Sequence, residues 1–509
     1  MANSCLPLWR ILPLPIRMGK FFSMFWERMQ FSGLPRRAIV YRIAFVLLLS
    51  LIGTGCGDIF RPVANPIPGP APDPQNFHFA IVASQNAPGN PGSGMQIDVS
   101  GDTNIGTVPA GSLGVAAVGQ GPQGPVHAAI LSPGGNRVYL ANGTDDTVTT
   151  FSPASTLGAI GKATTITLPT DANPVFVHST ESKAMYVANN PVLPRSSPPC
   201  PGTSFVAVIN TASDVVTNFI CVGLQAAVLA ETPDGHKLYS VDKGSGSVTA
   251  INTVDQTVNK TIAGFNGLVW AVASLDSTKL YVLDQSGLSV IDTTSDTLIP
   301  ASSVSLAAGS NFMFLDRHLN RLYVTNSNTG SLTILDAAAN PLKLLPNAVA
   351  LRSTVAMVTA LNDGIRAYVA SYQVGACSTP NNPQDTCVTS QIAVIRTSDN
   401  TLTKTIDLGA VDLTTSGLLQ SKAVCDAAAS SGRFPISIAS SVDSSKVYVA
   451  NCYAGSTSVI RTSDDACVTN PVTHQCANIN SPVSAYPSAP GQPLPPPPPQ
   501  NPLWVVAGP

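Results

Sequence analysis

A tyrosine-centred motif recurs along most of the chain and constrains its fold more than any other feature. Its best copy is RLYVTN at residues 321–326, followed by a polar turn and a second apolar run, SLTILD. Seven copies are centred on Tyr139, Tyr186, Tyr239, Tyr281, Tyr323, Tyr368 and Tyr448. An eighth, degenerate copy is FAIVAS at residues 79–84, and the tightest spacing between tyrosines is 42 residues. Internal repeats of this size indicate a solenoid, a propeller or an array.

Each repeat unit contains four short strand-like runs. In one unit they are VWAVAS (269–274), KLYVLD (279–284), LSVIDT (288–293) and DTLIPASSVSL (296–306), separated by turn-forming residues. Four antiparallel strands in a unit of this length correspond to one propeller blade. We therefore predict an all-β fold, a β-propeller of four-stranded antiparallel blades. We favour eight blades, with seven as the alternative if residues 79–84 do not belong to a full blade.

The motif also resembles a known repeat family. Residues 323–326 (YVTN) match the motif that names the YVTN-type β-propeller repeat, and residues 289–293 (SVIDT) are similar to its next strand. The resemblance covers residues 77–480 and implies the propeller fold, but propellers host unrelated activities. In such a blade Leu322 and Val324 face one neighbouring blade and Tyr323 faces the other. The Asn and Asp residues that end these strands are expected to be structural, because they recur in every blade.

The N-terminal region has the pattern of an export signal. Residues 36–56 (RRAIVYRIAFVLLLSLIGTGC) combine positive charges, an apolar core and small residues before Cys56. The GTGC ending resembles a bacterial lipobox, which implies lipid attachment at Cys56 and a membrane-anchored place in the cell envelope, facing the periplasm or the exterior. The alternative is an ordinary signal peptide and a secreted protein. We interpret residues 1–35 as a mis-assigned or extended N-terminus and residues 57–76 as a Pro-rich tether.

The C-terminal region is expected to close the ring. The first unit lacks an innermost strand, because the Pro-rich tether precedes Phe77. Residues 481–502 form a Pro-rich linker, and residues 503–509 end the chain with the apolar run LWVVA. We predict that Trp504–Ala507 supplies the missing strand. The alternative is that this tail is disordered.

The cysteines favour disulfides over metal binding. None of the ten forms a Cys-x-x-Cys pair, and eight of them lie in the repeat region. The spacing favours the pairs Cys200–Cys221, Cys377–Cys387 and Cys467–Cys476, which leaves Cys425 and Cys452. A zinc site that recruits His474 matches no common ligand spacing.

Four insertions interrupt the repeats, at residues 191–203, 372–390, 409–433 and 464–480. Function on a repeat scaffold often lies in such loops, so Tyr372 and its loop are our candidate ligand site. The alternative is that these insertions are surface loops that the fold tolerates.

No catalytic signature stands out in the sequence. Haem-attachment, phosphate-loop, nucleophile-elbow and His-Glu-x-x-His motifs are all missing from the chain. Charged residues make up 11% of the chain with a net charge of −2, which excludes the basic face that nucleic-acid binding requires. We therefore expect a monomeric binding or scaffold module for envelope protein or glycan partners, with no cofactor. The alternative is a periplasmic propeller enzyme, either a lactonase-like hydrolase or a quinoprotein-like dehydrogenase.

Overall fold

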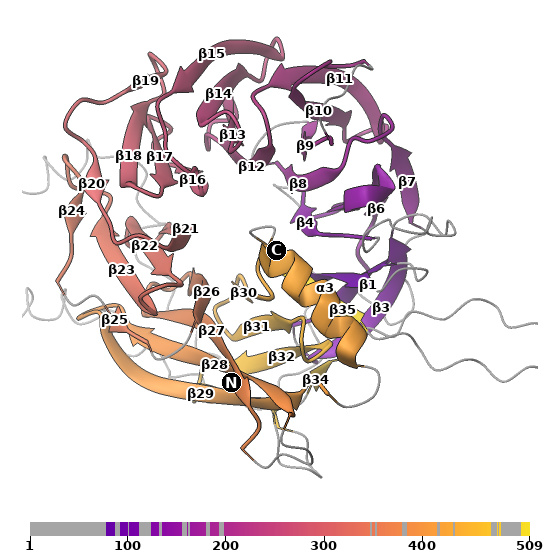
Figure 1. The fold of residues 1–509 in the computed structure, drawn as a ribbon, viewed down its shortest axis with the longest axis vertical. Coiled ribbons are helices and arrows are strands. Elements are labelled where there is room, and N and C mark those ends of the chain that lie inside the picture. Colours follow the sequence, from indigo (N-terminus) through magenta and orange to yellow (C-terminus); the bar gives the residue numbers. More distant parts are fainter. Residues whose placement is uncertain are drawn as a thin grey trace, which may run out of the picture. The chain divides into compact units, whose positions relative to one another are not determined.

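Eight antiparallel sheets, each built on four consecutive strand positions, are arranged in a ring (Figure 1). The structure is a computed structural model. It describes residues 78–508 except 87–91, 100, 111–123, 132–134, 155–159, 161–162, 180–183, 193–197, 347–348, 352–353, 379–383, 415–417, 431–432, 470–475, 477 and 480–499. All of these residues belong to the second of two units, residues 69–509. The predicted all-β propeller with eight blades is confirmed.

Each of the first four blades contains four strands, named from the innermost strand outward. Blade 1 contains β35 (Gln500–Gly508), β1 (Phe79–Asn86), β2 (Gly92–Asp98) and β3 (Thr103–Ala110). Blade 2 contains β4 (His127–Ile130), β5 (Val138–Ala141), β6 (Thr147–Phe151) and β7 (Thr164–Thr167). Blade 3 contains β8 (Pro174–His178), β9 (Ala184–Asn189), β10 (Ser204–Asn210) and β11 (Val215–Val222). Blade 4 contains β12 (Ala226–Glu231), β13 (Lys237–Asp242), β14 (Ser247–Asn252) and β15 (Thr257–Ala263).

The outermost position of three later blades is split into two short strands. Blade 5 contains β16 (Trp270–Ala273), β17 (Lys279–Asp284), β18 (Gly287–Asp292), β19 (Thr297–Leu298) and β20 (Val304–Ser305). Blade 6 contains β21 (Ser310–Asp316), β22 (Arg321–Asn326), β23 (Ser331–Asp336), β24 (Lys343–Leu344) and β25 (Val349–Ala350). Blade 7 contains β26 (Thr354–Ala360), β27 (Arg366–Ala376), β28 (Thr386–Arg396) and β29 (Thr401–Asp412). Blade 8 contains β30 (Ile436–Ser440), β31 (Lys446–Asn451), β32 (Ser456–Arg461), β33 (Ala466–Cys467) and β34 (Asn478–Ile479).

The recurring tyrosine motif forms the second strand of each blade and packs on both of its faces. Tyr323 is fully buried in the cluster shared with blade 7, whereas Leu322 and Val324 lie in the cluster shared with blade 5. Both faces of a blade are therefore apolar, which explains the nearly continuous hydrophobic runs in the sequence. The expected orientation of this strand is confirmed.

The polar residues that end the strands stabilise turns. The side-chain oxygen of Asn326 accepts hydrogen bonds from the backbone N–H groups of Asn328 and Thr329, both at 3.0 Å. Asp292 accepts equivalent bonds from Thr294 and Ser295 at 2.9 Å. Asn and Asp side chains suit this role because they satisfy the orphaned donors of a tight turn. The structural interpretation of these positions is confirmed.

The cation and the tyrosine of the motif join neighbouring blades through one aspartate. Asp296, in the outer turn of blade 5, accepts hydrogen bonds from Tyr239 Oη and Lys237 Nζ of blade 4, each at 2.6 Å. We call such a set an inter-blade clamp. The other clamp aspartates and their cations are Asp214 with Arg137, Asp465 with Arg366, and Asp102 with Lys446. In each of these, the motif tyrosine donates to the same aspartate.

The clamp aspartates share one backbone conformation. Their φ angles are +52° at Asp102, +53° at Asp214, +50° at Asp296 and +50° at Asp465. Asp is one of the few residues other than glycine that adopt this left-handed region readily. Blade 3 has Ala184 in place of the cation, and the matching turn position of blade 4 is Gln256, not an aspartate.

The C-terminal strand completes the first blade. β35 pairs antiparallel with β1 from Phe79↔Gly508 to Asn86↔Gln500, and so occupies the innermost position that the repeat pattern left open. It starts at Gln500, three residues earlier than the expected segment 503–509. The backbone N–H of Val505 also donates to Ser437 Oγ of blade 8 at 3.0 Å. Together with the Lys446–Asp102 clamp, these bonds join the last blade to the first.

Four disulfides secure the insertions. They join Cys200 to Cys221, Cys377 to Cys387, Cys425 to Cys452 and Cys467 to Cys476. The insertion at residues 409–433 contains a helix, α3 (Leu418–Ser430), which the strand-based interpretation missed. Figure 1 shows α3 on one face of the ring, near β30 and β35. In the part of the chain that the structure describes, no helix has the length and apolar character to cross a membrane.

Candidate functional site

Six aromatic side chains meet across the middle of the ring. They are His127 of β4, Phe176 of β8, Trp270 of β16, Phe312 of β21, Phe434 before β30 and Trp504 of β35. Blades 1 and 5 stand opposite each other in a propeller of eight blades. The indole groups of Trp504 in blade 1 and Trp270 in blade 5 are nevertheless stacked, with 6.4 Å between their centroids. These six residues, which we call the aromatic plug, therefore span the channel.

One mouth of the channel lies on the side of α3 and contains a cavity of about 420 Å³. Five of the plug residues, all except Phe312, form its floor together with Leu503. Its polar rim consists of Asn173, Asn190, Gln225, Lys243 and Arg433. We call this cavity and its rim the α3-side mouth. Residues before an innermost strand and residues between the second and third strands share this rim, because alternate turns of an antiparallel blade lie at the same edge.

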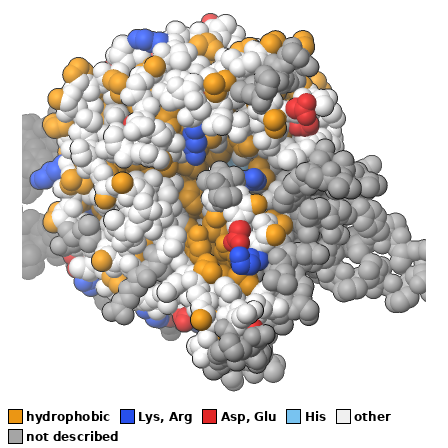
Figure 2. Space-filling view, viewed as in Figure 1, with side chains coloured by type: hydrophobic (Ala, Val, Ile, Leu, Met, Phe, Trp, Pro, Cys, Tyr) orange, Lys and Arg blue, Asp and Glu red, His pale blue; other side chains and the backbone are white. Residues whose placement is uncertain are grey.

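A second cavity of about 300 Å³ adjoins the first. Lys243, Arg433 and Phe434 line both cavities and so lie between them. Tyr372, the candidate from the sequence, lines this second cavity, and its ring lies 6.0 Å from that of Tyr453. Figure 2 shows basic side chains near the middle of this face, beside hydrophobic side chains in a hollow.

The α3-side mouth is cationic. Burial lowers the pKa of the Lys243 ammonium and of the Arg433 guanidinium, because an apolar environment disfavours their charged forms. No Asp or Glu is among the described residues that line either cavity. No described carboxylate lies within ion-pair distance of Lys243. The described lining of the mouth thus contains two cations and no carboxylate.

His127 lies where the plug meets this mouth. Its side chain is buried, and burial followed by the nearby His178 lowers its pKa well below the usual value, so the ring is neutral. Nδ1 accepts a hydrogen bond from the backbone N–H of Val177 at 3.4 Å, which places the ring proton on Nε2. Nε2 has no partner among the described residues, and His127 lines the cavity. The mouth therefore has a buried N–H donor available to a ligand.

The opposite mouth has a different character. Its cavity of about 370 Å³ is lined mainly by apolar residues from the far ends of the innermost strands, together with His178, Glu231 and Arg317. Burial, and then the charge of Arg317, lower the pKa of His178 to about 4. This wall carries both signs of charge, unlike the α3-side mouth.

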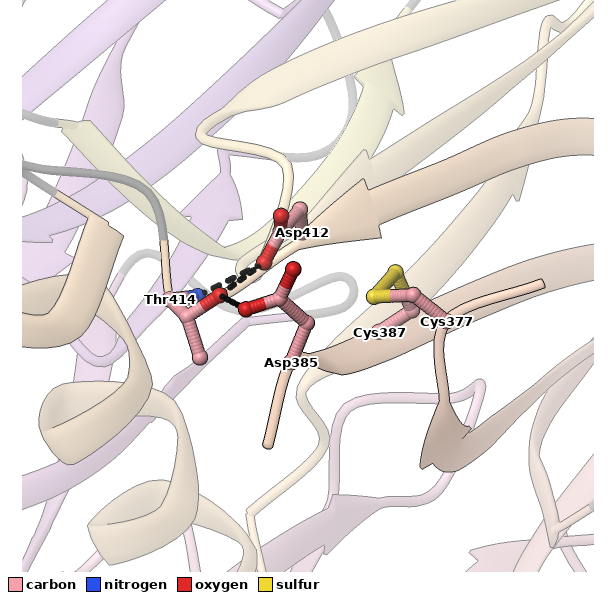
Figure 3. The surroundings of a disulfide bond; sticks show 5 residues. All are labelled: Cys377, Asp385, Cys387, Asp412 and Thr414. Carbon is pink, nitrogen blue, oxygen red and sulfur yellow. Dashed lines mark hydrogen bonds between the residues drawn. A yellow bond between two sulfur atoms is a disulfide. The ribbon is translucent and has the colours of Figure 1, made fainter. Parts of the chain in front are cut away.

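The disulfide-bonded hairpin of blade 7 contains the only close group of His, Cys, Asp or Glu ligand atoms found among the described residues. Cys377, Cys387 and Asp412 have ligand atoms within 4.8 Å of one another (Figure 3). The two sulfurs form a disulfide and so offer no thiolate to a metal ion. Thr414 donates to Asp385 at 2.9 Å, and its backbone N–H donates to Asp412 at 2.9 Å. We interpret this cluster as structural.

Sequence reasoning missed the plug and the cationic rim, although a signal was present. Five of the plug aromatics stand in or just before the first strand of their unit, in VFVHS, VWAVAS, NFMFLD, RFPISIA and LWVVAG. Comparing first strands across units would have shown this shared position. Cys56, the expected lipid-attachment residue, lies outside the described residues, as do residues 1–35 and the tether at 57–76.

Comparisons with known proteins support the architecture. No family model and no curated protein matches the chain. Among solved structures, apo AztD from Citrobacter koseri is 10% identical, with a TM-score of 0.52 over 85% of this chain and 98% of that one.

Two further similar structures have lower TM-scores. Hydrazine synthase from Kuenenia stuttgartiensis is 17% identical, with a TM-score of 0.44 over 57% of this chain and 76% of that one. The Dos1 propeller is 12% identical, with a TM-score of 0.42 over 57% of this chain and 73% of that one. Of these three structures AztD has a TM-score above 0.5, and at 10% identity its likeness shows the propeller fold alone.

Proposed function

We propose that the chain is a binding module of the bacterial cell envelope, without catalysis of its own, that holds its ligand in the α3-side mouth. The observation that carries this proposal is the cavity of about 420 Å³ with an aromatic floor and a polar rim. Ligand sites in proteins are commonly concave, mostly apolar and edged by a few polar groups. A cavity of this size suits a small molecule or the terminal group of a larger envelope protein or glycan.

The chemistry of the wall supports binding over catalysis. The described lining of this cavity offers amide groups, two cations and the His127 N–H, but neither a carboxylate nor a thiol. Hydrolytic propeller enzymes need a base or metal-binding carboxylates directed at the substrate. The hydrolase and dehydrogenase alternatives therefore have no specific support from this mouth.

The envelope location is supported by the disulfides and by the signal pattern in the sequence. Four disulfides are consistent with an extracytoplasmic or secreted protein. We propose that Cys56 carries the lipid and that residues 57–76 tether the ring to the membrane. Fractionation of cells that produce the Cys56→Ala variant should find the protein in the soluble fraction instead of the membrane fraction. An unchanged membrane fraction would contradict lipid anchoring.

A thermal-shift screen tests ligand binding at the mouth. The screen would use small molecules of all charges with the wild-type protein and with the Asn190→Trp variant, in which the larger side chain fills the cavity. The backbone N–H and C=O of Asn190 bond to Asn173, so the substitution preserves both bonds. Val192→Trp makes the same kind of substitution at a residue that is 76% exposed and does not line the cavity, so it is the matched control and should keep binding.

Two results would contradict the proposed function. One is that compounds stabilise the wild type and the Asn190→Trp variant equally, which places binding elsewhere. The other is that a stabilising compound is chemically converted during incubation, which makes the protein an enzyme. We expect stabilisation that is lost in Asn190→Trp, retained in Val192→Trp and accompanied by recovery of the unchanged compound.

A further inference from the structure

We infer that the ligand of the α3-side mouth is a small organic anion with a flat, apolar body, held by Lys243, Arg433 and the His127 N–H over the aromatic plug. This inference rests on the proposed function and specifies the chemical class of the ligand.

The negative charge follows from Lys243, and Arg433 is a second cation in the same lining. Lys243 and Arg433 line both cavities of the mouth, and no described Asp or Glu lines either cavity. Removing a cation from water is unfavourable unless a negative group compensates for the lost hydration. An anion beside Lys243, which has no described carboxylate within ion-pair distance, supplies that compensation. Arg433 can also bind a carboxylate or phosphate through two parallel hydrogen bonds.

The hydrogen-bond acceptor follows from His127. Its Nε2–H is buried and has no partner among the described residues. A buried donor without a partner costs free energy, which an acceptor atom on the ligand would recover. The same ring lies 3.8 Å from Phe176 and 4.2 Å from Trp504, so the donor is fixed in position before any ligand arrives.

The flat, apolar body follows from the floor. Trp270 and Trp504 lie nearly parallel, with an angle of 22° between their ring planes. Phe176 and Phe434 add further ring surface to the same cavity. Planar groups gain from stacked or edge-on contact with such rings. A hydrated inorganic ion would leave this apolar surface uncovered, so an organic anion matches the cavity better.

Three probes of nearly the same shape test the charge. Benzoate, benzamide and benzamidinium carry negative, neutral and positive groups on one planar ring. Phenyl phosphate, added as a fourth probe, separates a carboxylate ligand from a phosphate monoester. Two of the four tryptophans of the chain, Trp270 and Trp504, line the mouth, and the other two, Trp9 and Trp26, precede the described residues. The full chain with Trp9→Phe and Trp26→Phe therefore reports binding by its fluorescence.

We expect at least one of the two anions to bind about tenfold or more tightly than benzamide, and benzamidinium to bind most weakly. Lys243→Met and Arg433→Met should each weaken binding of the anion about tenfold, and added salt should weaken it in the unsubstituted mouth. Arg317→Met, which removes a cation from the opposite mouth, is the matched control and should leave binding unchanged.

Each contrary outcome has a definite meaning. Equal binding of the charged and neutral probes, or binding that Lys243→Met and Arg433→Met leave unchanged, overturns the anion inference. Failure of both anions to bind overturns it too, because either is small enough for the cavity. In all of these cases a neutral or cationic compound that is excluded by Asn190→Trp would still support the proposed function. If Asn190→Trp excludes nothing, the proposed function itself fails.

Discussion

Asp242 is a buried carboxylate at a motif position that several other blades fill with an uncharged asparagine. Four other copies have Asn at this position: Asn142, Asn189, Asn326 and Asn451. The Asp242 carboxylate is buried and accepts hydrogen bonds from Thr249 Oγ1 at 2.5 Å, Ser240 Oγ at 2.7 Å and the Gly223 N–H at 3.0 Å. Burial outweighs these bonds and raises its pKa from 3.8 to about 6.

This raised pKa makes stability depend on pH. The folded state holds the proton more tightly than the unfolded state, so the contribution of Asp242 is complete below about pH 4 and is lost as pH rises through about 6. Asp242→Asn removes this titration while keeping one oxygen acceptor. The free energy of unfolding of the variant relative to wild type should therefore increase by about 2–3 kcal/mol between about pH 4 and 7. Urea unfolding across this range measures it, and a difference that does not change with pH would contradict the assignment.

At the same scale, the sequence predicted the turn residues but not the residues of the mouth. Asn326 and Asp292 recur with the repeat, so their role follows from their position. Lys243 and Arg433 occur once each, in turns that look like any polar turn. Their importance depends on which turns meet around the channel, and a linear sequence does not state this.

Among elements, the four inter-blade clamps each connect an outer turn to the preceding blade. Asp296→Ala would leave the Tyr239 hydroxyl without its acceptor and Lys237 without its counter-ion. We expect the variant to lose about 3 kcal/mol of unfolding free energy, because the aspartate side chain is fully buried. Chemical denaturation is the measurement.

Gln256→Ala is the matched control for this clamp. Gln256 occupies the same turn position in blade 4, with a φ of +57°, so alanine is equally strained there. The Gln256 side chain carries no charge, and blade 3, which precedes blade 4, has Ala184 where a clamp has its cation. A loss as large as that of Asp296→Ala would show that turn strain, and not the clamp, explains the effect.

The disulfide of α3 provides a second test among the elements. The two cysteines of the Cys425–Cys452 bond are 27 residues apart in the sequence, whereas those of Cys467–Cys476 are 9 residues apart. Replacing the first pair by serine should cost about 3 kcal/mol, roughly 1 kcal/mol more than replacing the second. Calorimetric unfolding of the two double variants compares them. An equal loss would indicate that loop length does not set their contribution.

The helix itself marks a limit of the sequence interpretation. The repeat pattern located the insertion at residues 409–433, because the insertion breaks the period. Its helix was missed although QSKAVCDAAAS is rich in alanine, the strongest helix former. The strand repeats of this chain predict where the insertion lies but carry no information about the secondary structure inside it.

For the whole molecule, closure of the ring depends on β35. Leu503 and Val505 are buried, and Trp504 belongs to the aromatic plug. Deleting residues 500–508 would expose the edge of β1 and remove these contacts, with an expected loss of about 5 kcal/mol or more. Differential scanning calorimetry should show a much lower midpoint for this deletion than for deletion of Pro509 alone. Equal midpoints would mean that ring closure does not limit stability.

The architecture was predictable because its sequence pattern recurs in every blade. The aromatic plug has no such recurring pattern, because its residues come together only across the whole ring. Each repeat contains four strand-like runs, and the seven tyrosine motifs together with the degenerate copy at residues 79–84 predict eight blades. The contact between Trp270 and Trp504 joins blades that stand opposite each other, so it exists only after the ring has closed.

The pairing of β35 with β1 also fixes an order of events during synthesis. Phe79 pairs with Gly508, so the two partners are separated by nearly the whole ring in the sequence. A ribosome makes the rest of blade 1 first and its innermost strand after all the other blades. The ring therefore stays open, and its aromatic plug incomplete, until β35 has been made.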